Sequence, residues 1–192
     1  MTPERRRGEA LVRAIHEAVL AEVSEVGLGQ LTMEGIARRA GTAKTVLYRR
    51  WATTHELLID ALAQTCPVEV PSPGANDLRG DLIAALTLLT DWMQTASAGA
   101  VLAITSERHR YPELAEALYR KVFDPRGGTF TTTVLQHYVA NGQVDPKRLT
   151  PITTQIGEAL VFKLAIDLDR RPAAEELAAI VDEALLPALG VG

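Results

Sequence analysis

Apolar residues recur at the spacing of an α-helix through most of this 192-residue chain. Between Glu9 and Val26 they form a stripe that would lie on one face of a helix: Leu11, Ile15, Ala18, Val19 and Val26. Alanine and leucine dominate the periodic segments, whereas runs of β-branched residues are scarce. The pattern therefore predicts an all-α fold, in a chain long enough to bury a core in one domain or two small ones.

Glycine and threonine predict where the first helices end and begin. Gly27 would end the first helix, because glycine accepts the left-handed turn that often follows a helix. Thr32 would cap a short helix over residues 33–40, and Thr42 would cap a second one over about 43–50.

A longer helix is expected next, over residues 54–65. Thr53 is followed three residues later by Glu56, the spacing of a capping box. Three prolines and a glycine make residues 66–77 a connector that cannot be helical. Further helices are predicted over about 78–95, 97–109, 112–123, 129–141, 150–168 and 173–189.

Charge is distributed unevenly along the chain. The formal net charge is −4, yet residues 35–55 contain no Asp or Glu. The cations within this basic window are Arg38, Arg39, Lys44, Arg49 and Arg50. An acidic protein with one basic segment is compatible with nucleic-acid binding, because only the contacting face needs a positive potential.

The basic window coincides with two short predicted helices joined through Gly41, which is the helix-turn-helix arrangement. Leu47 would pack the second helix against Ile36 and Ala37 of the first. The side chains left on the outer surface are Lys44, Thr45, Tyr48 and Arg49, which could clamp phosphates or contact base edges. Helix N-termini at Thr32, Thr42 and Thr53 or Thr54 would offer backbone N–H groups to phosphate oxygens.

The stretch LTMEGIARRAGTAKTVLYRRWATTHELLIDAL, residues 31–62, resembles the DNA-binding core of TetR-family transcriptional repressors. The residues that carry this resemblance are Thr32, Ile36-Ala37, Ala40-Gly41, Leu47-Tyr48, Arg50-Trp51 and Leu57-Leu58. It implies about nine to ten helices: an N-terminal three-helix helix-turn-helix DNA-binding domain over residues 1–65, and a C-terminal helical ligand-binding and dimerisation domain over 66–192.

The sequence departs from the family pattern at several positions. Ala43 and Thr45 stand where serine and glycine are common, and Trp51 stands where phenylalanine or valine is usual. Thr54 replaces a frequent lysine, so Thr53, His55 or a backbone N–H would have to anchor that phosphate. The operator of the family therefore cannot be carried over to this chain.

By the resemblance, the protein would be a repressor that binds a palindromic duplex operator as a homodimer and leaves it when a small effector binds, which the aromatic residues discussed below suggest is hydrophobic. The implied DNA-binding residues are Thr32, Thr42, Lys44, Thr45, Tyr48, Arg49, Arg50 and His55. Tyr48 would bind a phosphate through its hydroxyl, or else pack in a partly buried position. Trp51 is expected in the core, and Arg5–Arg7 would form either a minor-groove arm or a basic tail.

The last two predicted helices carry more apolar residues than one thin domain needs to bury. These residues are Ile152, Ile156, Ala159, Leu160, Leu164 and Leu168, then Leu177, Ile180, Val181, Ala184 and Leu185. A four-helix bundle between two protomers, through about 150–168 and 173–189, would cover them. The alternative is an ordinary core within one chain.

An effector site is expected among large side chains on otherwise apolar helix faces. The candidates are Trp92, Met93, Phe123, Phe130, Tyr138 and Phe162. An aromatic-lined cavity would suit a hydrophobic molecule, although each of these residues could equally be plain core.

The sequence contains none of the motifs that would indicate an enzyme, a cofactor or a metal site. It has no nucleophile elbow, no glycine-rich phosphate loop and no Cys/His spacing typical of zinc. Cys66 is the only cysteine, which fits a reducing cytoplasm, and no secretion signal or membrane span is expected. The rival hypothesis is a helical ligand-binding protein whose helix-turn-helix does not read DNA.

Overall fold

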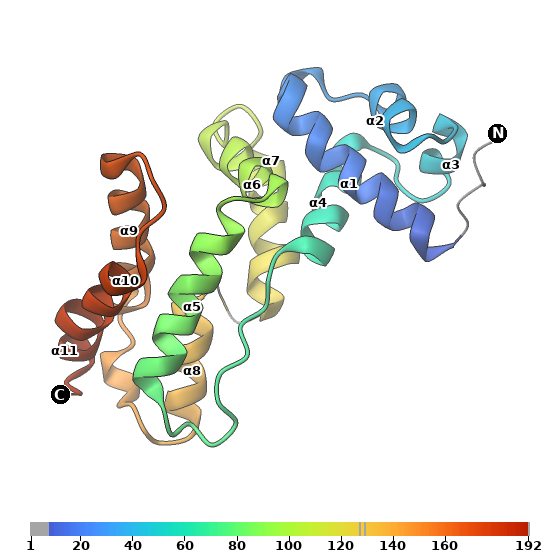
Figure 1. The fold of residues 1–192 in the computed structure, drawn as a ribbon. Coiled ribbons are helices and arrows are strands. Elements are labelled where there is room, and N and C mark those ends of the chain that lie inside the picture. The colour runs from blue at the N-terminus through green and yellow to red at the C-terminus, as the bar shows by residue number, and fades with distance from the viewer. Residues whose placement is uncertain (1–7, 127, 129, 192) are drawn as a thin grey trace. The chain divides into compact units, whose positions relative to one another are not determined.

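The computed structural model describes residues 8–126, 128 and 130–191. All regular secondary structure in these residues is helical, which confirms the predicted all-α class. The helices are α1 (Glu9–Val26), α2 (Met33–Ala40), α3 (Lys44–Tyr48), α4 (Thr54–Thr65), α5 (Leu78–Trp92), α6 (Ala96–Ser106), α7 (Pro112–Leu118), α8 (Thr131–Ala140), α9 (Pro151–Leu168), α10 (Ala174–Ile180) and α11 (Leu186–Leu189) (Figure 1). The tripeptide Arg5–Arg7 lies outside the described residues.

Two short π-helical turns extend these helices. Tyr119–Phe123 continues α7, and Val181–Leu185 joins α10 to α11. Both turns fall within segments that the sequence predicts as single helices. In the part of the chain that the structure describes, no helix has the length and apolar character needed to cross a membrane.

The chain forms two compact units, each built from two separate segments. The first contains the residues up to Cys66 together with Thr95–Val122, and the second contains Pro67–Gln94 together with the residues from Phe123 onward. Helices α6 and α7 therefore pack in the same unit as the first four helices. The compact units do not coincide with a division of the chain at residue 65.

In the first unit, α1 packs against α2, α4 and α6, and α7 packs against α4 and α6 (Figure 1). The middle of the apolar stripe of α1 enters the core, where Ile15 and Val19 are fully buried, whereas Val26 at its end is exposed. Ile104 of α6 and Leu118 of α7 are fully buried as well. Burial of these side chains explains why the α6–α7 pair joins the unit that begins the chain.

In the second unit, α5 packs against α8, α9 and α10. Leu82, Leu86 and Leu89 lie on one face of α5 and are fully buried. Gly157 allows α9 to approach its neighbours closely, because a Cβ atom there would lie 2.9 Å from the Cδ1 atom of Leu185. The core of this unit thus forms around α5.

The connector that precedes α5 is held by a cluster of polar side chains. Asp81 accepts hydrogen bonds from the Ser72 backbone N–H at 2.8 Å, from the Ser72 hydroxyl at 2.7 Å and from the Tyr138 hydroxyl at 2.7 Å. The Asp77 N–H donates to the Tyr138 hydroxyl at 3.0 Å, and the His137 ring donates to the Ser72 carbonyl at 2.9 Å. We call these five residues the connector clamp.

These contacts shift the pKa values of Asp81 and Tyr138. Burial alone would raise the pKa of Asp81, but hydrogen bonds from Ser72 and Tyr138 lower it below its ordinary value. Burial raises the pKa of Tyr138, and the adjacent Asp81 carboxylate acts in the same direction. The clamp is therefore most stable with Asp81 ionised and Tyr138 neutral.

Candidate nucleic-acid interface

Helices α2 and α3 form the helix-turn-helix that the sequence predicts. Gly41 ends α2 in the left-handed conformation, with φ of 66°, and the Thr42 N–H bonds back to the Ala37 carbonyl at 3.0 Å. Leu47 is fully buried, as is Ile36, so α3 is anchored on α2 by its one inward apolar side chain. The rest of α3 is left available for contact with a partner.

Two of the three predicted threonine caps are present. The Thr32 hydroxyl accepts from the Gly35 N–H at 3.0 Å, and the Thr53 hydroxyl accepts from the Glu56 N–H at 3.1 Å. The Glu56 carboxylate accepts from the Ala52 N–H at 2.8 Å, so the box around Thr53 closes one residue earlier than expected.

The predicted cap at Thr42 is wrong. Ala43 is the N-cap residue of α3, and no side chain accepts a hydrogen bond there. The chain enters α3 one residue later than predicted, because Thr42 is used by its backbone to close the turn after α2. The side chain of Thr42 is half-buried beside this turn.

The outer surface of the helix-turn-helix carries the predicted polar and basic side chains. Lys44, Thr45, Tyr48, Arg49 and Arg50 are all exposed, and Tyr48 keeps 55% of its surface open to solvent. Within the described residues, Lys44, Arg49 and Arg50 form no ion pair with any acid. Cations that no carboxylate neutralises are free to bind an external anion.

Arg39 differs from the other cations of the basic window. Its guanidinium donates to the buried Glu22 carboxylate at 2.8 Å and also pairs with Glu25. The hydrogen bond to Glu22, and then the one to Glu25, raise the pKa of Arg39. Arg39 thus fixes α2 to α1, and its charge is compensated within the protein.

Trp51 lies in the core, as the sequence predicts. It is 4% exposed, and its indole N–H donates to the Asp60 Oδ2 atom at 2.9 Å. The Nε2 atom of buried His16 lies 3.1 Å from the same oxygen, and the rings of His16 and Trp51 are 5.7 Å apart. The segment that follows α3 is therefore tied to both α1 and α4.

His55 is half-buried in the first turn of α4. Its ring meets the Tyr111 ring edge-on, with centroids 5.5 Å apart and planes at 81°. One edge of the imidazole is thus committed to a contact with the turn between α6 and α7. Sequence reasoning did not foresee this contact, since 56 positions separate the two residues.

The six predicted effector-site residues occupy different environments in the second unit. Trp92 and Phe130 are buried with their rings 5.6 Å apart, and Phe123 is half-buried in its π-helical turn. The Tyr138 hydroxyl belongs to the connector clamp, whereas Phe162 is 40% exposed on α9. One of the six, Met93, lines the pocket described next.

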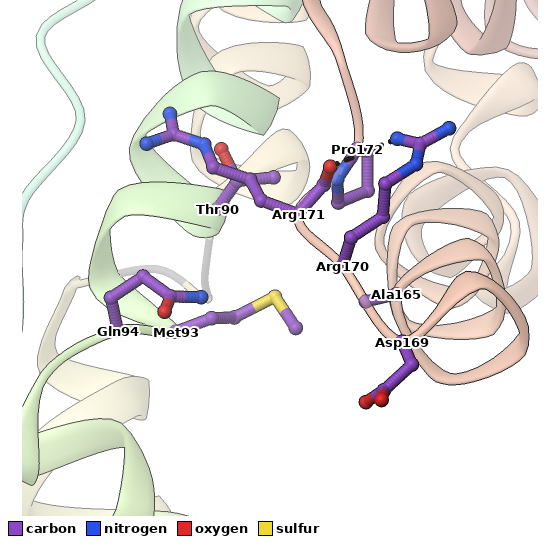
Figure 2. A pocket seen from close by; sticks show the side chains of 8 residues that line it. All are labelled: Thr90, Met93, Gln94, Ala165, Asp169, Arg170, Arg171 and Pro172. Atoms are coloured by element: carbon purple, nitrogen blue, oxygen red, sulfur yellow. Dashed lines mark hydrogen bonds between the residues drawn. The ribbon is translucent and has the colours of Figure 1, made fainter.

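Met93 lines a pocket of about 280 Å³ between the end of α5 and the segment that follows α9. The complete lining is Thr90, Met93, Gln94, Ala165, Asp169, Arg170, Arg171 and Pro172 (Figure 2). Figure 2 shows the Met93 side chain extending from α5 toward the side of the pocket formed by Ala165 and Arg170. This lining is largely polar and contains no aromatic side chain.

The two arginines of the pocket are already paired. Arg170 forms a two-point ion pair with Glu176 at 2.8 Å, and Arg171 pairs with Asp91. The Arg170 guanidinium, with the Ala173 N–H, lowers the pKa of Glu176 to about 2. These pairs hold the chain between α9 and α10 in place on the wall of the pocket.

Two known domain families match most of the chain. Residues 15–61 match the family described as bacterial regulatory proteins, tetR family, and residues 72–184 match the tetracyclin repressor-like C-terminal domain. The chain belongs to the TetR family. It is a transcriptional regulator with a helix-turn-helix that binds DNA, and not an enzyme.

Relatives within the TetR family include two curated regulators. The HTH-type transcriptional regulator AqdR of Rhodococcus erythropolis is 31% identical over 139 residues, which cover 72% of this chain and 66% of AqdR, just under two thirds of its length. The DNA-binding transcriptional repressor TetR of Mycobacteroides abscessus is 29% identical over 122 residues, covering 62% of this chain and 63% of that protein.

Solved structures share the fold along the full length. A TetR family transcriptional regulator from Pseudomonas syringae pv. tomato aligns with a TM-score of 0.64 and 22% identity, covering 96% of this chain and 97% of the other. The TetR architecture thus accounts for both compact units.

Proposed function

We propose that this protein is a homodimeric repressor that binds a palindromic duplex operator and is released from it by a small molecule. The observation that carries the DNA half of this proposal is the group of exposed cations on the helix-turn-helix, Lys44, Arg49 and Arg50, which have no acidic partner in the described residues. Duplex DNA presents a dense row of phosphates that such cations neutralise.

Each predicted DNA contact has a role in this proposal. Lys44 and Thr45, in the first turn of α3, face the major groove, and the Tyr48 hydroxyl binds a phosphate. Arg49 and Arg50 add phosphate contacts where α3 ends. The DNA backbone on either side of α3 is contacted by Thr32, Thr42 and His55. Tyr111 positions the His55 ring.

A dimer is required because a palindrome is read by two recognition helices about one DNA turn apart, ~34 Å. The exposed side of α9 supplies a surface for it. Exposed positions follow alternating spacings of three and four residues along this helix, at Ile152, Gln155, Ala159, Phe162 and Ile166. We call these five residues the α9 seam, since this spacing is that of helices that pack side by side.

The dimer surface proposed here is smaller than the one predicted from the sequence, because it is centred on the α9 seam. Leu177, Ile180, Val181 and Leu185 are buried within the chain itself, so they cannot supply much new apolar surface to a partner. By contrast, Ile152 and Ile166 are 72% and 76% exposed. Helix α9 would therefore be the centre of the dimer, with the outer side of α10 and α11 beside it.

We place the effector in the pocket between α5 and α9, within a ligand-binding and dimerisation region formed by residues 66–192. The fold accommodates small molecules: the multidrug binding protein EbrR, which aligns at a TM-score of 0.53 and 15% identity, was solved with proflavin. Binding would shift α4, whose Leu57 to Leu62 segment is packed in the first unit, and change the spacing of the two recognition helices. Because the proposed partner is operator DNA, we expect the protein in the cytoplasm.

The proposal is tested by selecting duplexes from a random library with the purified protein and titrating the selected sequence with salt. An enriched palindrome is expected, with an affinity that falls steeply as salt rises. Lys44→Ala should reduce both the affinity and the salt dependence. Tyr48→Phe should weaken the free energy of binding by about 1.5–3 kcal/mol, the range for one lost hydrogen bond to a charged group.

The same experiment addresses the rival hypothesis. If no sequence is enriched and binding is weak even at low salt, the helix-turn-helix does not read DNA. The protein would then be a helical ligand-binding protein, and a search for ligands of the pocket would take precedence.

A further inference from the structure

The turn between α6 and α7 lies beside two parts of the proposed DNA interface. It contains Glu107, Arg108, His109, Arg110 and Tyr111, and we call it the α6–α7 turn. Its Tyr111 ring contacts His55 in the first turn of α4. A Cβ atom built on Gly29, three residues before the Thr32 cap of α2, would lie 3.4 Å from the Tyr111 hydroxyl and 3.8 Å from an Arg110 Nη atom.

We propose that the α6–α7 turn is a further phosphate-binding element, in which Arg110 contacts the DNA backbone outside the helix-turn-helix. This inference rests on the proposed DNA-binding function. It adds a contact from a segment that follows the whole N-terminal helix-turn-helix region in the sequence.

The distances allow Arg110 and Thr32 to contact the same DNA strand. Three residues of extended chain span at most about 11 Å, so the Arg110 guanidinium lies within about 15 Å of Thr32. Phosphates of one strand follow one another at ~3.4 Å along the duplex axis. Arg110 and Thr32 are therefore close enough to contact phosphates that lie a few nucleotides apart.

The Arg110 side chain is exposed to solvent, and its guanidinium lies over the Tyr111 ring. It keeps 71% of its surface open to solvent, and its guanidinium carbon lies 5.4 Å from the centre of the Tyr111 ring. A cation held on an aromatic face loses less side-chain freedom when it binds an anion. Because Tyr111 is itself packed on His55, the guanidinium lies near the first turn of α4.

The nearest acid does not neutralise this cation firmly. The Glu107 carboxylate lies 3.8 Å from the Arg110 Nη1 atom, at the long end of ion-pair distances. An exposed pair of this kind contributes little. A phosphate can displace it and gain charge-assisted hydrogen bonds in its place.

The test is the salt dependence of binding of the full-length protein to its selected operator duplex. The variants are Arg110→Ala, Arg110→Lys and, as a matched control, Arg120→Ala. Arg120 lies in the same unit, is 64% exposed and has a similarly loose pair with Glu116 at 3.5 Å. Arg110→Ala should weaken binding about threefold to tenfold and lower the slope of log K against log salt by about 0.9, the value for one lost phosphate contact.

The charge-conserving Arg110→Lys should retain most of the wild-type slope, and Arg120→Ala should match the wild type in affinity and slope. A loss of affinity in Arg110→Ala with an unchanged slope would mean that Arg110 only supports the structure around Gly29, and would overturn the inference. Identical behaviour of Arg110→Ala and Arg120→Ala would also overturn it. If the wild type shows no salt-dependent duplex binding, the proposed function fails and the inference fails with it.

Discussion

The Tyr138 hydroxyl holds the connector before α5 to α8. It donates to Asp81 and accepts from the Asp77 N–H, so its hydrogen-bonding capacity is used within the protein. The hydroxyl of a residue that the sequence suggests for an effector site thus has a structural role. The Asp81 carboxylate is the shared acceptor of this arrangement.

The free energy of unfolding should depend on pH through the Asp81 carboxylate. The folded protein has a lowered pKa at Asp81, so its ionised form stabilises the fold above the unfolded pKa of about 3.8. This contribution is lost as the pH falls through the folded value. Asp81→Asn should therefore lower the free energy of unfolding by about 1–3 kcal/mol at pH 7, and by progressively less below pH ~4.

Urea unfolding at a series of pH values measures this difference directly. The control is Glu17→Gln, because Glu17 is exposed on α1 and forms no ion pair in the described residues. It should leave the free energy of unfolding nearly unchanged at every pH. A wild-type advantage over Asp81→Asn that stayed constant down to pH 2 would contradict the proposed role of the carboxylate.

Most ends of the first helices could be predicted from the sequence. The caps at Thr32 and Thr53 and the stop at Gly41 depend on groups only a few residues apart, so local sequence signals them. The error at Thr42 arises because its backbone N–H bonds to the Ala37 carbonyl and closes the turn after α2, so α3 begins one residue later than predicted. The π-helical turns after α7 and α10 lie in segments that the sequence predicts as single helices.

Gly41 forms the turn that sets the angle between α2 and α3. Its left-handed backbone conformation is energetically unfavourable for residues that have a Cβ atom. At φ of 66°, Gly41→Ala should lower the free energy of unfolding by about 1–2 kcal/mol. It should also weaken operator binding, because the turn positions the recognition helix. Urea unfolding and operator binding would be measured on the same preparation.

Gly142 provides the matched control for this turn. It follows α8 in the second unit with φ of 71°, and no heavy atom lies within 4 Å of a Cβ built on either glycine. Gly142→Ala should carry the same stability cost without the loss of operator affinity. Equal operator affinities for the two variants would show that the turn at Gly41 is not specifically required.

For the whole molecule, the α9 seam should determine the oligomeric state. Ile166→Glu places a charge at the most exposed apolar position of α9, so it should convert a dimer to monomers in sedimentation experiments at several protein concentrations. Operator affinity should then fall by about 100-fold or more, because the two half-sites are no longer read by one linked species.

Val70→Glu is the control for the seam, since Val70 is 88% exposed in the connector and lies outside α9. It should leave both the oligomeric state and the operator affinity unchanged. A wild-type protein that sediments as a monomer while binding a palindrome tightly would contradict the dimer model.

Local sequence signals determined the helical fold, the helix-turn-helix and the expectation of outward-facing cations in and after α3. Each of these depends on periodicity, capping or turn preferences that act over a few residues. The sequence also separated the non-helical connector from the helices that flank it. The family resemblance added the expectation of a ligand and a dimer.

Tertiary packing decided which residues of the same type serve which role. Arg39 is neutralised by Glu22 and Glu25 while Lys44 stays unpaired, although both belong to one basic window. Tyr138 meets Asp81 across 57 positions, and His55 meets Tyr111 across 56. Such contacts form only when distant helices are packed together, because no local pattern specifies which side chains will then be neighbours.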